Sequence, residues 1–196
     1  VRFFHGDRSS TATLTVDPAR NPNSLAIEPQ EVELGVGTTA HLKLVGDYGD
    51  GVKVDLTGAA YWVPNREGTV FSYNGFVEGL AEGTAKVVAR YQATPESKPM
   101  EATAQVRVAK IDFKGLEMAI EPLPVPLGRA SKLQVNLISK ADKKYSVLES
   151  SRLKLKVEPP GIAAVYGPYL EGLKSGTGRI EASWNDKLTA DLRFEV

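Results

Sequence analysis

The chain has 196 residues, with 24 Lys and Arg against 24 Asp and Glu, so its formal charge at neutral pH is zero. This balance gives no electrostatic argument for binding nucleic acid or an anionic membrane, since both attract a basic excess or patch. The chain contains no cysteine, which excludes disulfides and thiolate metal sites. It also lacks a run of about 18 apolar residues that could span a bilayer.

Apolar and polar residues alternate along most of the chain. In chain order, the alternating stretches cover residues 40–44, 87–91, 104–108, 133–137, 180–184 and 192–196. A period of two predicts strands with one buried face. Turn sequences separate them, namely Asp50-Gly51, Asn74-Gly75 and Pro159-Pro160-Gly161. No segment keeps a 3.6-residue period, so we predict an all-β protein of short antiparallel strands in a sandwich or barrel.

An internal repeat organises these strands. Val77-Glu78-Gly79-Leu80 reappears as Leu170-Glu171-Gly172-Leu173, at a spacing of 93 residues (170 − 77). Several other pairs keep this spacing until residue 91, after which it falls to 88 (194 − 106), because the first repeat has a longer connection over residues 92–100. The repeat predicts two domains, 24–109 and 115–196, joined by a moderately flexible linker at 110–114. We expect an elongated two-domain rod with a modest interface.

The glycines of the repeated stretch have two possible explanations. Gly79 allows a bend or close backbone approach, and Gly83 allows a turn before the next strand. A phosphate-binding loop would instead need a following helix and a Lys or further glycine spacing. Because these features are missing, we interpret the stretch as a turn.

Residues 1–16 fit neither repeat. With an offset of 180 they align with residues 181–196, which places Gly6-Asp7 at a turn and matches Phe4, Leu14 and Val16 to apolar residues. We predict the terminal hairpin of a preceding repeat, followed by a linker at 17–23; a disordered tail is the alternative. Such a hairpin is marginal by itself, so we expect it to be ordered only by packing against the first domain or by pairing with another molecule. The missing initiating Met and signal peptide indicate a fragment or processed product.

One group of residues carries a family resemblance. It comprises Leu25-Ala26-Ile27-Glu28-Pro29, Leu34-Gly35, Gly37-Thr38, Val54-Asp55-Leu56-Thr57, Trp62, Asn74-Gly75-Phe76-Val77-Glu78-Gly79-Leu80 and Gly83-Thr84-Ala85-Lys86-Val87. Together they resemble the bacterial Ig-like domain, group 2. The second repeat is similar but more divergent: Leu155 stands at the position of Trp62, Ser146-Val147-Leu148-Glu149 replaces the Asp-x-Thr element, and residues 162–165 fit only with a small local gap.

The resemblance implies two tandem Ig-like antiparallel β-sandwich domains, preceded by a hairpin remnant of a third. It also implies an extracellular or cell-envelope location and supplies no catalytic, cofactor-binding or metal-binding residues. We therefore expect a non-enzymatic protein without a cofactor.

The titratable residues form no recognisable catalytic motif or metal-binding motif. His41 lies on the polar face of a strand and His5 in a turn-like stretch, with no catalytic grouping around either. Asp47, Asp50 and Asp55 supply the hard oxygens that calcium prefers, but their spacing matches no EF-hand, and Asp50-Gly51 is explained by a hairpin turn. Residues 140–144, which include three lysines, are predicted to form a solvated hairpin tip rather than a binding patch.

The aromatic residues divide into two groups. Trp62 and Trp184 are predicted to lie in the cores of the two sandwiches. Several tyrosines are expected to be exposed, where they could stack on sugars or be ordinary surface residues; the candidates are Tyr48, Tyr61, Tyr73, Tyr145, Tyr166 and Tyr169.

The sequence therefore predicts a non-catalytic spacer or adhesion segment of a larger secreted or cell-surface bacterial protein. Its expected partners are other domains of that chain and a surface glycan or protein receptor. The alternative is a carbohydrate- or ligand-binding accessory module of an exported enzyme.

Overall fold

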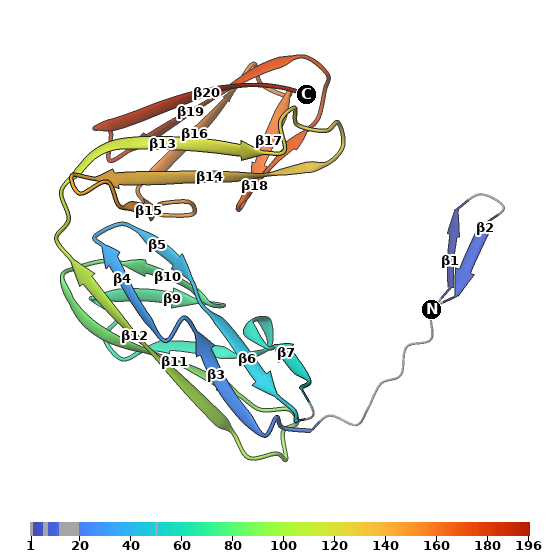
Figure 1. Cartoon of the computed structure of the whole chain (residues 1–196), viewed down its shortest axis with the longest axis vertical. Helices are drawn as coiled ribbons and strands as arrows, with labels where there is room; N and C mark the ends of the chain where they lie inside the picture. Colours follow the sequence, from blue (N-terminus) through green and yellow to red (C-terminus); the bar gives the residue numbers. More distant parts are fainter. Residues whose placement is uncertain (1, 6–7, 12–19, 50) are drawn as a thin grey trace.

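The computed structural model describes residues 2–5, 8–11, 20–49 and 51–196. This part of the chain is almost entirely β-structure, and its one helical element is a single 3-10 turn, η1 (Thr57–Ala59). No helix among the described residues is both long and apolar enough to cross a membrane. The fold is a tandem of two Ig-like antiparallel β-sandwiches (Figure 1), as the alternating pattern predicts.

The first sandwich contains three sheets. Their strand orders are β3-β6-β7, β5-β10-β9 and β4-β12-β11-β8. The strands are β3 (Ser24–Glu28), β4 (Glu31–Gly35), β5 (Thr39–His41), β6 (Lys43–Asp47), β7 (Lys53–Asp55), β8 (Tyr61–Pro64), β9 (Val70–Tyr73), β10 (Phe76–Gly79), β11 (Gly83–Tyr91) and β12 (Met100–Ala109). All pairings are antiparallel except that between β4 and β12, which is parallel.

The second sandwich contains two sheets. One has the order β13-β14-β18-β17, with β15 also paired to β14, and the other has the order β16-β19-β20. The strands are β13 (Phe113–Glu121), β14 (Ala130–Ser139), β15 (Lys144–Ser146), β16 (Leu153–Glu158), β17 (Ala163–Tyr166), β18 (Tyr169–Gly172), β19 (Thr177–Trp184) and β20 (Leu188–Glu195). Because β13 already begins at Phe113, only residues 110–112 separate it from β12.

Each sandwich has its own core. Trp62 belongs to the first cluster of buried residues and Trp184 to the second, with exposed fractions of 5% and 9%. The prediction that both tryptophans are core residues is therefore confirmed. The inward-facing residues of β11 and β14 alternate strictly with exposed or half-buried ones, which is the pattern of a strand with one buried face.

The 93-residue spacing is preserved in the structure at the centre of the repeat. Hairpin β9–β10 covers residues 70–79 and hairpin β17–β18 covers residues 163–172, with the same offset at every strand end (163 − 70, 172 − 79). The local gap expected at residues 162–165 is therefore not needed. The predicted turn at Asn74-Gly75 is confirmed, since both residues adopt positive φ, at 49° and 79°.

The two sandwiches differ at one edge. In the first, β4 pairs with β12 over Glu31–Gly35. The corresponding segment of the second contains Pro124 and Pro126, which lack the backbone N–H that a ladder requires. This segment is limited to a bridge between Leu127 and Gly172 and a hydrogen bond from the Val125 N–H to the Glu195 carbonyl, at 2.8 Å.

The N-terminal residues form a hairpin of their own. Strand β1 (Arg2–His5) pairs antiparallel with β2 (Arg8–Thr11). A hairpin was predicted here, but its assignment to a preceding repeat stays a prediction, because Gly6-Asp7, Leu14 and Val16 lie outside the described residues. His5 ends a strand rather than lying in a turn-like stretch, because its backbone pairs with Arg8.

Candidate functional site: the junction of the two sandwiches

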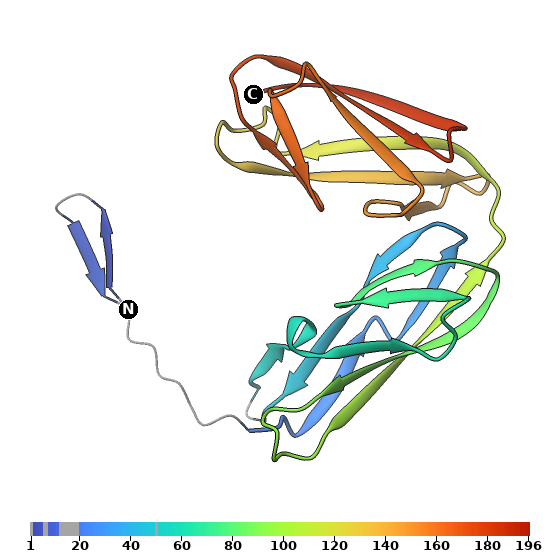
Figure 2. The same ribbon diagram turned by 180° about the vertical axis from the view of Figure 1, so that it is seen from behind.

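Several polar side chains of one sandwich contact the other where the two sandwiches meet. We call this region the junction: the turn between β4 and β5 together with β10 on one side, and residues 110–113 and 143–152 with Trp184 on the other. The second sandwich lies across the end of the first, so the two-domain arrangement is bent rather than a straight rod (Figures 1 and 2).

A buried carboxylate lies at the centre of the junction. Glu78, in β10, is only 4% exposed. Its Oε1 accepts hydrogen bonds from Ser150 Oγ at 2.9 Å, Ser151 Oγ at 3.0 Å and the Ser151 backbone N–H at 3.2 Å. The Ser150 hydroxyl can alternatively donate to the Gly37 carbonyl, at 2.9 Å. A buried charge is tolerated only when hydrogen bonds replace its hydration, and here the donors all come from the other sandwich.

Further polar contacts surround Glu78. Thr39 Oγ1 donates to the Leu148 carbonyl at 3.0 Å. His41 Nε2 lies 3.1 Å from Glu149 Oε2, so His41 faces a specific partner although its side chain is 60% exposed. No catalytic role for His41 follows from this contact.

An ion pair also bridges the two sandwiches. Lys143 Nζ lies 2.9 Å from Glu33 Oε2, and this hydrogen bond lowers the pKa of Glu33 and raises that of Lys143. Residues 140–144 do lie at a hairpin turn, between β14 and β15. However, Lys143 contacts the first sandwich and Lys140 pairs with Asp112 at 3.0 Å, so the segment is part of the junction rather than a purely solvated tip.

Two glycines allow the backbone of the first sandwich to approach the second. A Cβ at Gly35 would lie 2.8 Å from the Phe113 ring, and one at Gly37 would lie 2.8 Å from Arg152 Cδ and 3.1 Å from Trp184. Gly37 also has a φ of +83°, which disfavours any side chain. The corresponding Gly128 of the second sandwich has nothing within 4 Å of such a Cβ, so the close packing is specific to the junction.

Sequence reasoning missed the role of Glu78. It attributed Gly79 to a bend or a close backbone approach, and the close approach is confirmed, since a Cβ at Gly79, the last residue of β10, would lie 2.8 Å from the Gly35 carbonyl oxygen. The sequence offered one indication of this role: Glu78 and its counterpart Glu171 both stand next to apolar residues of a predicted strand. That indication does not reveal Ser150 and Ser151 as partners, since they are 72 and 73 residues away in the chain.

The aspartates weighed as candidate calcium ligands do not form a cluster among the described residues. Asp47 Oδ1 accepts a hydrogen bond from the Gly49 N–H at 2.8 Å, and Asp55 Oδ1 accepts one from the Thr57 N–H at 2.9 Å, so both carboxylates support local turns. Asp50 lies outside the described residues. Among the residues that are described, no group of three or more His, Cys, Asp and Glu could hold a metal ion.

Four aromatic residues, exposed or half-buried, lie together on neighbouring strands of the first sandwich. His41, Phe76 and Tyr73 are cross-strand neighbours on β5, β10 and β9, and Phe71 lies beside Glu78 in the adjacent row. Phe76 makes edge-on contacts with His41 and Phe71, with centroid distances of 5.6 and 6.3 Å. Tyr73 is 71% exposed. This aromatic row is continuous with the junction through His41.

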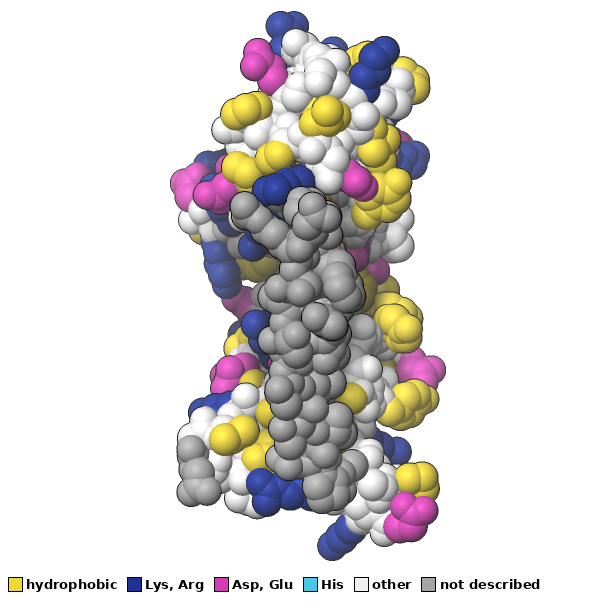
Figure 3. Space-filling view, turned by 90° about the vertical axis from the view of Figure 1, so that its right-hand side faces the viewer, with side chains coloured by type: hydrophobic (Ala, Val, Ile, Leu, Met, Phe, Trp, Pro, Cys, Tyr) yellow, Lys and Arg dark blue, Asp and Glu magenta, His cyan; other side chains and the backbone are white. Residues whose placement is uncertain are grey.

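The other tyrosines are divided between surface and interior. Tyr61, Tyr166 and Tyr169 are exposed, whereas Tyr145 is buried and Tyr48 half-buried. Burial and a hydrogen bond with Tyr91 raise the pKa of Tyr48 to about 12. Where the surface is visible in Figure 3, apolar side chains are scattered among charged ones rather than gathered into one large patch.

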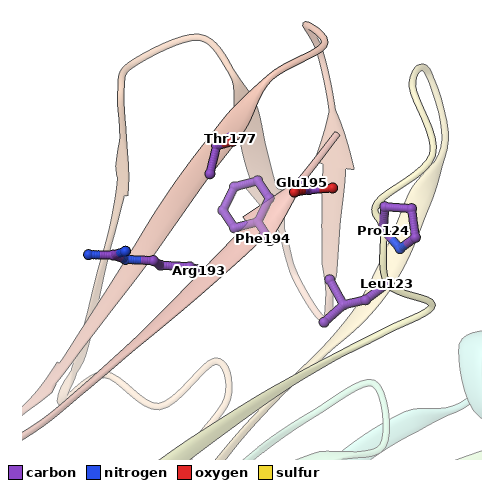
Figure 4. Close-up of a pocket in the computed structure, with 6 residues that line it drawn as sticks. All are labelled: Leu123, Pro124, Thr177, Arg193, Phe194 and Glu195. Atoms are coloured by element: carbon purple, nitrogen blue, oxygen red, sulfur yellow. The ribbon is translucent and has the colours of Figure 1, made fainter.

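Shallow hollows also occur on the second sandwich. One, of about 440 Å³, lies between the loop after β13 and the end of β20 (Figure 4). Leu123 and Pro124 form one side, and Phe194 and Glu195 the other, while Arg193 points away from Leu123. This hollow lies where the second sandwich lacks a counterpart of β4, and it brings together no acid–base pair.

No family model matches the sequence. One curated protein, ice-binding protein 1 of Shewanella frigidimarina, is 32% identical to this chain over 84 residues, which is 42% of this chain and 9% of that protein. The chain thus spans only a small part of its relative.

Several solved structures have a similar fold. They include domains 4–9 of the surface layer protein SbsC (15% identity, TM-score 0.46, 100% of this chain and 34% of the other), a β-glucuronidase of Parabacteroides merdae (13%, 0.34, 88% and 25%) and the Escherichia coli adhesin FdeC (13%, 0.28, 92% and 66%). Because all three TM-scores are below 0.5, these likenesses carry no argument about this chain.

Proposed function

We propose that this chain is a non-catalytic spacer segment of a larger secreted or cell-surface bacterial protein, built from bacterial Ig-like modules of group 2 at residues 24–109 and 115–196. The modules hold neighbouring domains of the same protein, or a receptor-binding surface, at a defined separation and angle. The location rests on the family resemblance of the motif residues.

The observation that carries this proposal is the junction. A flexible tether needs no contacts between its modules, but here Glu78 is buried against Ser150 and Ser151, and Gly35 and Gly37 allow close packing. A docked arrangement that covers Glu78 but removes its donors would leave the carboxylate without hydration or hydrogen bonds, which is costly, so other docking angles are disfavoured. A segment that maintains one angle between its ends is suited to spacing and presentation.

Small-angle scattering of the chain tests the spacer role. The expected result is a profile that a single bent two-module arrangement fits, and that changes toward a mixture of arrangements in Glu78→Ala. Glu82→Ala, an exposed carboxylate of the next loop, serves as the matched control and should leave the profile unchanged. A wild-type profile that requires freely moving modules would contradict the spacer role.

A second function, carbohydrate binding, is favoured by the aromatic row. Exposed rings can stack on sugar faces, and Tyr and His supply hydrogen-bonding groups beside them. Tyr73 and Phe71 are the accessible rings, and Glu149 lies beside His41 at the junction end of the row.

A glycan-array measurement distinguishes this second function from pure spacing. Binding that is lost in Tyr73→Ala but kept in Tyr166→Ala, an exposed tyrosine of the other sandwich, would assign a sugar site to the aromatic row. Binding that both variants keep would remove the row from consideration.

A further inference from the structure

A second feature of the junction lies on its linker side. A hollow of about 400 Å³ is lined by apolar side chains from both sandwiches and the linker: Val36, Ile111, Phe113, Trp184 and Leu188. We call it the junction hollow. Its volume is within the range of sites that bind small molecules, which are characteristically apolar with a few polar groups at defined positions.

The rim of the junction hollow has an excess of positive charge. Lys110, Lys140, Arg152 and Lys187 line it, against the single carboxylate of Asp112, which gives a surplus of three (4 − 1). Asp112 is paired with Lys140. The other three cations have no carboxylate partner within 4.0 Å among the described residues. Like charges gathered at an apolar depression produce a local positive potential that attracts anions.

Trp184 provides an independent observation. Its indole is 9% exposed and forms one wall of the junction hollow, and its Nε1 is buried without a hydrogen-bond partner among the described residues. By contrast, Trp62 Nε1 donates to the Thr57 carbonyl at 3.0 Å. Buried donors are almost always paired, so this N–H, which is covered by protein atoms beside the hollow, is an exception, and its signal reports on changes at the Trp184 wall.

We propose that the junction hollow binds a small organic anion, namely a carboxylate carried on a ring. The carboxylate is held by Arg152 with Lys187 and Lys110, since guanidinium and ammonium groups make the strongest hydrogen bonds to such an acceptor. The ring covers the apolar floor formed by Phe113 and Trp184. Because Val36 belongs to the first sandwich and Arg152 to the second, the bound anion contacts both. This site does not depend on the spacer role.

The experiment is a titration of the whole chain, followed by the indole N–H signals in nitrogen-15 NMR spectra. Phenylacetate and glucuronate are the probes, because they carry the carboxylate on an aromatic and on a sugar ring, and phenylacetamide and glucose are their neutral counterparts. Trp184→Phe identifies the signal of Trp184. We expect that signal to shift saturably with at least one carboxylate probe and to remain unchanged with its neutral counterpart.

Substitutions locate the site. Arg152→Gln and Lys187→Gln should each weaken binding of the carboxylate by about tenfold, which is the effect of one charge-assisted hydrogen bond. Arg179→Gln is the matched control, because Arg179 pairs with Glu181 and Asp191 on the outer sheet face; it should change the affinity less than about twofold on the same scale. Because Arg152 also contacts Gly37, Arg152→Gln can change the packing of the two sandwiches as well as the affinity. Lys187 lies on an exposed turn, so the affinity of Lys187→Gln is the deciding measurement.

The outcomes separate the sources of the ligand. A response to phenylacetate alone identifies aromatic carboxylates, a response to glucuronate alone identifies sugar acids, and a response to both supports the broader class. The proposal is overturned if neither probe shifts the Trp184 signal, if the neutral compounds bind equally well, or if Lys187→Gln binds as the wild type does.

Discussion

At the scale of single residues, the two tryptophans are both core residues but differ in the surroundings of their indole rings. Trp62 fills the first core and its Nε1–H is paired with the Thr57 carbonyl, whereas Trp184 lies at the end of the second core against Phe113, with ring centroids 5.8 Å apart. Both were predicted to be core residues, and Trp184 ends one of the alternating stretches. That Trp184 Nε1 has no hydrogen-bond partner among the described residues could not be predicted, because it depends on how the sandwiches pack.

Trp62→Ala should lower the free energy of unfolding by about 3–5 kcal/mol, the usual cost of emptying a large aromatic site in a core. Urea denaturation measures this loss. Tyr61→Ala is a suitable control, because the neighbouring Tyr61 is 70% exposed and its removal should cost less than about 1 kcal/mol. A loss below about 1 kcal/mol for Trp62→Ala would contradict its core position.

Gly75→Ala should destabilise the first sandwich because of the backbone. Gly75 has a φ of +79°, and a Cβ there would lie 2.3 Å from the Leu42 carbonyl oxygen. We expect a loss of about 2 kcal/mol or more, from left-handed strain and this contact together. Gly68→Ala, at a position with open space around it and no positive φ, should be nearly neutral in the same thermal melts. Equal effects of the two substitutions would show that the β9–β10 turn is not as tight as described.

At the scale of elements, the alternating stretches predicted strands β5, β6, β11, β12, β14, β19 and β20. Hairpins β9–β10 and β17–β18 follow the 93-residue repeat at every strand end. The loss of a counterpart to β4 follows from Pro124 and Pro126, which were visible in the sequence but not considered. The junction could not be predicted in the same way. Glu78 and Ser150 are distant in the chain, and only the docked sandwiches bring the carboxylate and its donors together.

The turn around η1 predicts a pH dependence. Hydrogen bonds from Thr57 hold the pKa of Asp55 below its usual value of 3.8. A carboxyl with a lowered folded-state pKa contributes stability that is present above its unfolded pKa and is lost as the pH falls through the folded value. The difference in unfolding free energy between the wild type and Asp55→Asn should therefore be fully present at neutral pH and decline progressively as the pH falls below about 3.8. A difference that persists undiminished at pH 2 would contradict this assignment.

At the scale of the whole molecule, the contacts of the junction combine two kinds of interaction that fix an angle. Phe113 and Trp184 pack against glycines of the first sandwich, and Glu78 is surrounded by donors of the second. Because the linker between β12 and β13 is only three residues long, and Lys140 bonds to Asp112 within it, it leaves little freedom once these contacts form. The two sandwiches are therefore expected to behave as one bent body in solution.

The most direct test of this claim is a distance measurement between the two sandwiches. The chain has no cysteine, so Thr103→Cys in β12 and Thr189→Cys in β20 allow two spin labels without background, and pulsed electron resonance gives their distance distribution. We predict one narrow distribution for the otherwise wild-type chain, a broad one when Glu78→Ala is added, and an unchanged one with Glu82→Ala. A broad distribution in the presence of Glu78, or one that Glu78→Ala leaves narrow, would contradict the account.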